Sequence, residues 1–331
     1  MRAMVITSFG APEVFQEMQV PRPQIRPGHV LIRVKATSVN PMDIRIRSNS
    51  THPLAPTLPA ILHADVAGIV EEVGEGVTAF SPGDEVYGCA GGLLDLSGAL
   101  AEWMLADARL IALKPRSLSF WQAAALPLAG ITAWEGIVDR ANVQPGQKVL
   151  VHGATGGVGH LALQLAKWRG AIVTATASTE QKLKIATALG ADDLVNYRQE
   201  SVTDYRFRIT GEKGFDVVFD SVGGNNLPPS LEAAGRWGQV VTTTADQALP
   251  MQQLLYKSLT LHVIFMLVPL ISGERRENHG QILEHLAGLV DAGYLKPLID
   301  ETRFAISEVS AAHTYLMSGL ATGKVVLEAN W

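Results

Sequence analysis

The chain is 331 residues long, with 27 basic and 32 acidic side chains and a formal charge of −5. This length favours two domains, and so mild a charge argues against nucleic acid or an anionic membrane as a partner. Cys89 is the only cysteine, which excludes an intramolecular disulfide and a thiolate zinc cluster. The longest apolar run, 263–271, is too short to span a bilayer, and the N-terminus reads as a strand rather than a signal peptide. We therefore expect a cytoplasmic protein.

The first hundred or so residues are predicted to be rich in β-strand. Residues 30–36 alternate between apolar and polar side chains after a turn at 26–29, which indicates a half-buried strand. Residues 65–73 form a second, strongly apolar strand, and a Pro-Gly turn at 81–84 precedes a third. Helical periodicity then begins and extends over 120–138.

A glycine-rich turn follows the apolar strand that ends at residue 152. The turn, 153–159, leads into an amphipathic helix that ends near Arg169, and it fits the pattern G-x-G-x-x-G with Ala154 at the first glycine position. Such a turn lets backbone N–H groups and a helix N-terminus face a pyrophosphate. Any βαβ unit can use glycine in its turn, but three glycines in four residues are costly unless something must come close. We predict a dinucleotide site at Ala154, Thr155, Gly156, Gly157 and Val158.

The end of the next strand indicates which dinucleotide binds. This strand, 171–175, continues into Thr-Ala-Ser-Thr without the Asp or Glu that usually meets a free ribose 2′-hydroxyl. Lys182 follows one turn into the next helix, where it could neutralise a 2′-phosphate. Ser178 has a second interpretation as the capping residue of that helix, paired with Gln181. Glu180 could reach back to a ribose, so NADP(H) is favoured and NAD(H) stays open.

Strand and helix continue to alternate through 215–220 and 239–241, which predicts a parallel, doubly wound sheet of the Rossmann type. From about residue 266 we expect two further helical stretches and a closing strand at 324–327. The predicted fold class is therefore α/β, with a separate β-rich part.

Seven segments together resemble the medium-chain dehydrogenase/reductase superfamily over nearly the whole chain, and especially its zinc-independent, zeta-crystallin-like quinone oxidoreductase branch. They are residues 38–43, 58–61, 65–74, 83–86, 128–134, 190–192 and 323–327. The resemblance implies a GroES-like β-barrel catalytic domain (1–122 and 267–331) and a Rossmann domain (123–266) that holds the cofactor at the inter-domain cleft. It also implies a homodimer paired through the strand at 258–266, although a buried internal strand explains that segment equally well.

Zinc-dependent members of the superfamily place metal ligands at three positions that this sequence does not match. No cysteine comes directly after Asn40, where the sequence has Pro41, Met42 and Asp43, and Leu128 stands where those members have a second cysteine. His63 lies one residue too early to match their His-Glu pair. Because a catalytic zinc needs three converging protein ligands, we expect no metal and interpret His63 as a structural histidine. The quinone oxidoreductase pattern more often has glycine at position 63.

Without a Lewis acid to stabilise an alkoxide, alcohol oxidation is disfavoured. The resemblance then implies NADPH-dependent hydride transfer to a small-molecule acceptor that is already electron-poor, a quinone or an α,β-unsaturated carbonyl compound. Two alternatives remain open: an enoyl-thioester reductase of the same superfamily, and a non-catalytic NADPH-binding sensor or structural protein.

The resemblance also suggests individual site residues. Asn40, Asp43 and Thr132 are the candidates for catalysis; the further cofactor candidates are Thr132, Ser178, Lys182, Tyr197, Val222, Met266 and Lys324. Each has a structural alternative: Asn40 as a turn residue before Pro41, Asp43 as a hydrogen-bonding group, Thr132 as a helix-packing residue, Tyr197 as an ordinary strand aromatic and Lys324 as a solvated strand residue.

Overall fold

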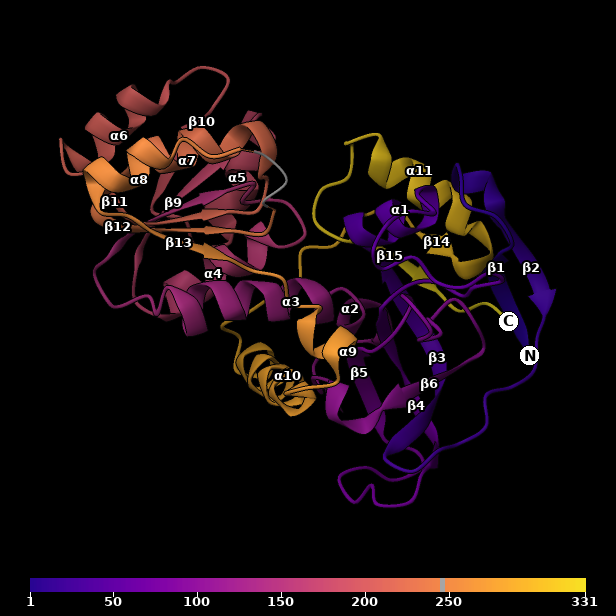
Figure 1. Cartoon of the computed structure of the whole chain (residues 1–331). Helices are drawn as coiled ribbons and strands as arrows, with labels where there is room; N and C mark the ends of the chain where they lie inside the picture. Colours follow the sequence, from indigo (N-terminus) through magenta and orange to yellow (C-terminus); the bar gives the residue numbers. More distant parts are fainter. Residues whose placement is uncertain (245–247) are drawn as a thin grey trace. The chain divides into compact units, whose positions relative to one another are not determined.

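The structure is a computed structural model that describes residues 1–244 and 248–331. It divides into two compact units (Figure 1). The terminal unit consists of Met1–Leu128, Leu267–Gly293 and Pro297–Trp331. The central unit consists of Ala129–Met266 and Tyr294–Lys296. The chain therefore leaves the terminal unit twice, after Leu128 and briefly after Gly293, and returns to it each time.

The terminal unit is built on a largely antiparallel seven-stranded sheet, ordered β14-β15-β3-β4-β5-β7 with β6 paired to β3. The strands are β3 (His29–Val39), β4 (Asp65–Val73), β5 (Glu85–Cys89), β6 (Trp103–Asp107), β7 (Ile111–Leu113), β14 (Phe304–Ala305) and β15 (Val325–Glu328). A separate hairpin pairs β1 (Arg2–Ile6) with β2 (Phe15–Gln19). The β-rich prediction for the first hundred residues is confirmed.

Helices of the terminal unit are mostly short. They are α1 (Pro41–Ser48), α2 (Phe120–Ala123), α9 (Val268–Ser272), α10 (Arg276–Asp291) and α11 (Val309–Met317), with the 3₁₀ turns Pro12–Val14, Ala108–Leu110 and Ile306–Glu308. The prediction of two helical stretches after residue 266 was wrong, because α9 and α10 are separate. Gly273, at φ 78°, ends α9 in the left-handed conformation that glycine adopts readily.

The central unit holds a six-stranded parallel sheet in the order β10-β9-β8-β11-β12-β13. Its strands are β8 (Lys148–His152), β9 (Ile172–Ala177), β10 (Asp193–Asn196), β11 (Phe215–Asp220), β12 (Ala234–Thr242) and β13 (Thr260–Val263). From β8 the sheet extends through β9 to β10 on one side, and the chain then crosses to the other side of β8, where β11, β12 and β13 follow. This reversal is the topological switch point of a doubly wound sheet, so the Rossmann prediction is confirmed.

Helices cover both faces of the parallel sheet, with α4 on one face and α6 and α7 on the other (Figure 1). They are α4 (Gly159–Trp168), α5 (Glu180–Ala188), α6 (Val202–Thr210), α7 (Leu227–Ala233) and α8 (Met251–Lys257), with a 3₁₀ turn at Gly224–Asn226. Leu161, Ala162 and Leu165 of α4 are fully buried, but every other residue from Gly159 to Ala166 is buried too. The helix is therefore covered on all sides over this range, and the prediction of an amphipathic helix was wrong there.

The helical periodicity predicted over 120–138 is confirmed, but it belongs to several short helical segments. After α2 ends at Ala123, α3 (Pro127–Trp134) begins, and a π-helical turn, Glu135–Arg140, follows it. Proline has no backbone N–H and is tolerated only in the first turn of a helix, so Pro127 marks a new helix rather than the middle of one.

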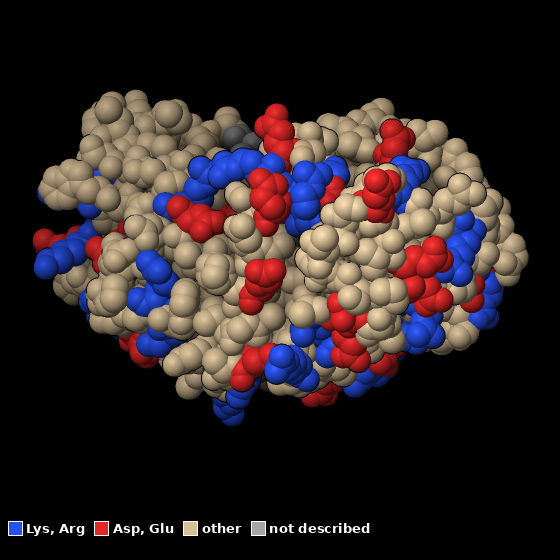
Figure 2. Space-filling model, turned by 90° about the horizontal axis from the view of Figure 1, so that it is seen from below, with Lys and Arg blue, Asp and Glu red and all other residues tan. Residues whose placement is uncertain are grey.

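The surface carries mixed charge. On the face drawn in Figure 2, basic and acidic side chains are interspersed rather than gathered into fields of one sign, as the net charge of −5 suggests. Within the described residues, no helix is long and apolar enough to cross a membrane.

Candidate active site

A buried carboxylate, Asp65, organises the polar centre of the terminal unit. It is the first residue of the largely apolar strand β4 and is fully buried. Its Oδ1 accepts from the backbone N–H of Leu128 at 2.8 Å. Its Oδ2 accepts from the Ser38 hydroxyl at 2.6 Å and the Asn40 amide at 2.9 Å. A buried charge is tolerated only with such partners.

Lys324 supplies the opposite charge. Its ammonium lies 3.3 Å from Asp65 Oδ2 and donates a short hydrogen bond to Asn40 Oδ1. The side chain is only 3% exposed, so the alternative of a solvated strand lysine was wrong. Asn40 is also buried, and its amide joins both charged groups. It therefore does more than occupy a turn before Pro41.

Asp43 completes this polar cluster. It accepts a hydrogen bond from the backbone N–H of Asn40 at 2.7 Å, across the first turn of α1. Its pKa is raised to about 7, mainly by burial and also by the nearby Asp65 carboxylate, against the opposing effects of the hydrogen bond from the Asn40 N–H and the charge of Lys324. Asp43 is thus an acid that can hold or release a proton near neutral pH. The structure brings together Asn40, Asp43 and Lys324, three of the residues that the sequence suggested.

The Asp65 cluster (Ser38, Asn40, Asp43, Asp65 and Lys324) is suited to stabilising negative charge. Its ammonium and amide groups are held by hydrogen bonds in a buried setting, where electrostatic interactions are stronger than in water. Asp65 and Ser38 were missed from the sequence as site residues. The available signal was an aspartate at the head of an otherwise apolar strand.

The donor set of the terminal unit does not fit a catalytic zinc. Within the described ranges, 1–244 and 248–331, no group of three His, Cys, Asp or Glu side chains could hold a metal ion. The Leu128 side chain has no donor atom, and both oxygens of Asp65 are already hydrogen-bonded. Lys324 places a positive charge against Asp65, where a metal ion would be repelled.

In the central unit, the glycine-rich turn connects β8 to α4. A Cβ on Gly159 would lie 2.1 Å from the Gly153 carbonyl oxygen, so only glycine lets α4 begin this close to the turn. Ala154 and Thr155 are buried, and Gly156 donates its N–H to the Gly153 carbonyl at 2.8 Å. The turn therefore presents main chain rather than side chains at the start of α4, which fits a dinucleotide pyrophosphate.

The residues proposed for the adenosine end lie after neighbouring strands. Asn196, the last residue of β10, pairs with Ala177, the last of β9. Tyr197 and Ser178 therefore follow two adjacent carboxyl ends, where ligands of open α/β sheets bind. Tyr197 is 55% exposed, which is unlike an ordinary packed aromatic. Lys182 lies in the first turn of α5.

The proposed capping role of Ser178 was wrong. Thr179 precedes α5, and its hydroxyl accepts from the backbone N–H of Lys182 at 3.3 Å. Thr179 can cap α5 because its backbone is extended at φ −142° and ψ 154°. Ser178 therefore does not cap α5, and its position after β9 is compatible with the predicted cofactor contact.

The remaining candidates lie elsewhere in the central unit. Val222 is 55% exposed and follows β11. Its backbone N–H donates to Asp220, a buried carboxylate that also binds the N–H of Gly223 and so shapes this loop. No sequence motif distinguishes Asp220 from the rest of its strand. Thr132 in α3 and Met266 after β13 are 5% and 4% exposed.

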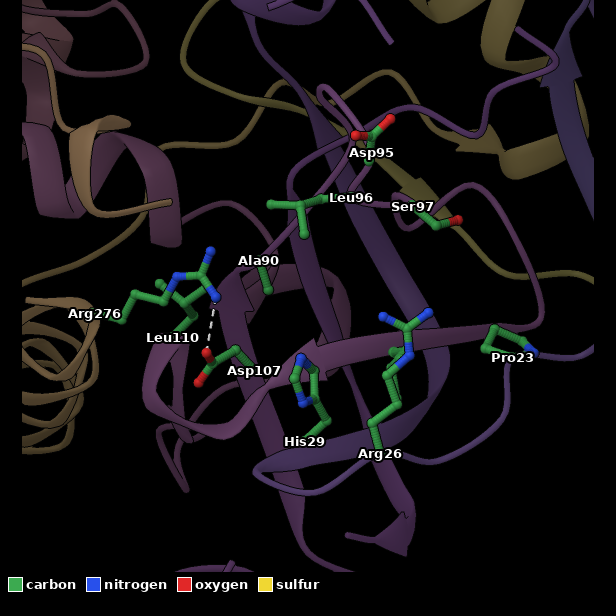
Figure 3. Close-up of a pocket in the computed structure, with 11 residues that line it drawn as sticks. Pro23, Arg26, His29, Ala90, Asp95, Leu96, Ser97, Asp107, Leu110 and Arg276 are labelled. Atoms are coloured by element: carbon green, nitrogen blue, oxygen red, sulfur yellow. Dashed lines mark hydrogen bonds and ion pairs between the residues drawn. The ribbon is translucent and has the colours of Figure 1, made fainter. Parts of the chain in front are cut away.

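A separate small pocket lies in the terminal unit (Figure 3). Its volume is about 120 Å³, below the roughly 300–1,000 Å³ of most small-molecule sites. Arg276 at its wall pairs with Asp107 at 2.8 Å and donates to the Leu270 carbonyl at 2.7 Å. The pocket contains none of the residues that the sequence suggested, so we do not assign the active site to it.

An antiparallel β-unit together with a doubly wound sheet and a glycine-rich turn defines the alcohol dehydrogenase class of fold. Residues 26–116 match the alcohol dehydrogenase GroES-like domain, and residues 189–327 match the zinc-binding dehydrogenase family. The chain is 34% identical to the quinone oxidoreductase of Pongo abelii, over 99% of this chain and 97% of that one. It is also 34% identical to a chloroplastic NADPH-dependent alkenal/one oxidoreductase of Arabidopsis thaliana, over 99% of this chain and 79% of the relative.

Solved structures agree with this assignment. An alcohol dehydrogenase superfamily protein from Novosphingobium aromaticivorans is similar with a TM-score of 0.95 and 38% identity, over all of both chains. A mycobacterial protein solved in complex with NADPH has a TM-score of 0.88 and 29% identity, over 99% of this chain and 100% of that one. The chain belongs to the medium-chain dehydrogenase/reductase superfamily, in its quinone oxidoreductase branch. The predicted resemblance and the GroES-like assignment are confirmed.

Proposed function

We propose that this protein is an NADPH-dependent oxidoreductase that transfers hydride to a quinone or an α,β-unsaturated carbonyl compound without zinc. One observation carries the proposal: the polar centre of the terminal unit is built around a buried ammonium, Lys324, rather than around metal ligands. The names of the relatives, quinone oxidoreductase and alkenal/one oxidoreductase, support the same acceptor class.

In addition to a bound acceptor, the reaction requires one hydride, which carries both electrons, and one proton. NADPH supplies the hydride; with one proton, an enone becomes a saturated ketone and NADP⁺ is released. Asn40 and Lys324 provide fixed hydrogen-bond donors and positive charge suited to a developing oxyanion. Asp43, with its pKa raised to about 7 by burial, can hold the proton near neutral pH. Thr132 is proposed to position the nicotinamide.

The test of this proposal is steady-state NADPH oxidation with 1,4-benzoquinone, 9,10-phenanthrenequinone and a simple enone, with crotonyl-CoA in parallel. Acceptor-dependent turnover of the quinones or the enone is expected. Turnover of crotonyl-CoA alone would assign the protein to the thioester reductases. Tight NADPH binding without turnover of any acceptor would instead indicate a sensor or structural protein.

The cofactor proposal predicts a specific effect of Lys182→Ala. We propose that Ser178, Lys182 and Tyr197 receive the adenosine 2′-phosphate, because all three lie at or just after the adjacent carboxyl ends of β9 and β10. Removing the ammonium of Lys182 is expected to weaken NADPH binding about 10- to 100-fold, since hydrogen bonds to charged groups contribute roughly 1.5–3 kcal/mol. Binding of NADH should stay unchanged.

Fluorescence titration with both cofactors measures this effect. The exposed Lys184, on the same helix, provides the control variant Lys184→Ala. Equal losses for NADPH and NADH in the Lys182 variant would show that this lysine does not discriminate by the 2′-phosphate.

We also propose a homodimer that pairs through β13. This strand is at the edge of the parallel sheet, and Val263 and Phe265 beside it are 50% and 44% exposed. An open, apolar edge strand is ready to pair with another chain. Sedimentation should show a dimer for the natural protein and a monomer for Val263→Lys; a natural protein that sediments as a monomer would exclude this interface.

A cytoplasmic location is proposed from the cysteine content. The single cysteine, Cys89, is buried and free, and proteins that function in oxidising compartments more often carry disulfides. Cell fractionation should recover the protein with cytosolic markers, and recovery with membranes or secreted material would contradict this assignment.

A further inference from the structure

Two histidines, His63 and His313, form a fully buried pair beside the Asp65 cluster. Their Nε2 atoms are 2.9 Å apart, and neither side chain is exposed. His63 lies just before β4, whereas His313 belongs to α11, 250 residues further along the chain. The pair therefore connects distant segments of the terminal unit.

The hydrogen bonds determine which nitrogen of each ring carries the proton. The Thr37 hydroxyl has one hydrogen and donates it to the Asp65 carbonyl at 2.6 Å. It must therefore accept from His63 Nδ1, 3.2 Å away. In a neutral ring the other nitrogen then has only a lone pair, so His63 Nε2 accepts from Nε2–H of His313.

Both rings are held in the neutral form. Burial lowers the pKa of His63 well below its usual value, and the nearby His313 and Lys324 lower it further. Burial also lowers the pKa of His313 to about 3, with the positive charge of Arg47 adding to the effect. These groups form a series of hydrogen bonds, here called the histidine relay, in which each group donates to the next: His313 to His63, His63 to Thr37, and Thr37 to the Asp65 backbone carbonyl. The direction of donation is fixed at neutral pH.

The histidine relay reaches Asp65 just beyond the point where backbone pairing between β3 and β4 ends. The last paired residues of this ladder are Ala36 and Ala67. Beyond them, Asp65 is held to β3 by side chains, through Thr37 to its carbonyl and Ser38 to its carboxylate. These two side chains therefore help to hold Asp65 against β3, in addition to its backbone pairing with Cys89 of β5.

His63 has a backbone conformation that favours glycine. Its φ is +73°, in the left-handed region. Gly92 and Gly98 pack so closely that a Cβ on either would lie 2.5 Å and 2.6 Å from the His63 carbonyl carbon and oxygen, respectively. A bulky residue remains in such a strained conformation only where its surroundings compensate for it. Here the surroundings include the hydrogen bonds of the imidazole to His313 and Thr37 and the one from the Ala99 N–H to the His63 carbonyl at 2.9 Å.

We propose that His63 and His313 are positioning residues that hold Asp65, and through it Asn40 and Lys324, in place for acceptor reduction. This inference rests on the proposed function. Neither histidine touches the acceptor; each acts through Thr37 and the Asp65 carbonyl. Supporting hydrogen bonds of this kind, when removed from a functional site, typically reduce activity 10- to 100-fold.

Two variants remove hydrogen bonds of the histidine relay and are expected to keep the protein folded. In His63→Gly the strained backbone is relaxed as the imidazole is lost, so we expect the unfolding temperature to change by no more than about 4 °C. In Thr37→Val the link to Asp65 is removed, whereas Thr37→Ser keeps the hydroxyl and is the matched control. We expect kcat for the acceptor to fall about 10-fold in the first two variants and to stay near the natural value in the third. KM for NADPH should not change.

The double variant, His63→Gly with Thr37→Val, shows whether the two side chains act through one series of hydrogen bonds or independently. If His63 acts through Thr37, the two substitutions together should reduce kcat no more than either alone. Additive losses, or natural kcat in both single variants, would overturn the proposal.

A spectroscopic readout is independent of turnover. The Leu128 amide donates to Asp65 Oδ1 at 2.8 Å, so its proton chemical shift reports the position of the carboxylate. This shift should change in His63→Gly and Thr37→Val but not in Thr37→Ser. An unchanged Leu128 shift would overturn the positioning role, even if the natural protein failed to reduce any acceptor and the proposed function itself were wrong.

Discussion

Lys324→Met is expected to lower kcat/KM for the acceptor by about 100-fold while leaving NADPH binding intact, because removal of one preorganised donor at a developing oxyanion typically has an effect of this size. The ammonium belongs to the terminal unit, whereas the glycine-rich turn belongs to the central unit. The substitution should therefore change turnover of the acceptor without changing NADPH binding.

The same substitution should also reduce the free energy of unfolding by about 3 kcal/mol, because Asp65 would keep its buried charge after losing the ion pair at 3.3 Å. Denaturant unfolding, NADPH titration and steady-state turnover on one preparation measure all three quantities. Lys184→Met, at an exposed position, is the control. Turnover within threefold of the natural protein would exclude Lys324 from the chemistry.

Gly159→Ala is expected to weaken NADPH binding by about 100-fold or more. The new Cβ would lie 2.1 Å from the Gly153 carbonyl oxygen, so α4 must move away from the turn that it follows. The N–H groups at the start of α4 would then no longer face the pyrophosphate. Overpacking of this kind also reduces the free energy of unfolding, by about 1–3 kcal/mol.

Gly288→Ala is the matched control for this substitution. A Cβ at Gly288, within α10, would meet nothing within 4 Å. Alanine there should leave cofactor binding unchanged and add about 0.5–1 kcal/mol to the free energy of unfolding, because glycine is unfavourable inside a helix. If Gly159→Ala bound NADPH as tightly as Gly288→Ala does, the glycine-rich turn would not be the phosphate site.

Much of the central unit could be predicted from local sequence. Its inner strands β8 and β11 are mostly buried and read as continuous apolar runs, and the turn between β8 and α4 carries its own glycine signature. The burial of Leu161, Ala162 and Leu165 was predicted from helical spacing, but the burial of Gln164 on another face of the same helix was not. Errors arose at boundaries such as Thr179, where two adjacent residues could each cap α5.

The Asp65 cluster could be predicted only in part. Asn40, Asp43 and Lys324 were suggested by resemblance, but their contact joins residues about 280 positions apart, which no local pattern reveals. The intermediary, Asp65, is a single polar residue in an apolar strand. His313 carried no sequence signal, because its importance comes from one hydrogen bond to His63 across 250 residues.

The most direct test of the central claim follows the hydride itself. The protein, dialysed against a chelator, is incubated with NADPH that carries deuterium at both C4 positions and with a simple enone, and the product is analysed by mass spectrometry. We predict one deuterium in each reduced product, at the carbon β to the carbonyl, with no added metal. A product without deuterium, or turnover that appears only after zinc is supplied, would contradict a zinc-independent hydride transfer.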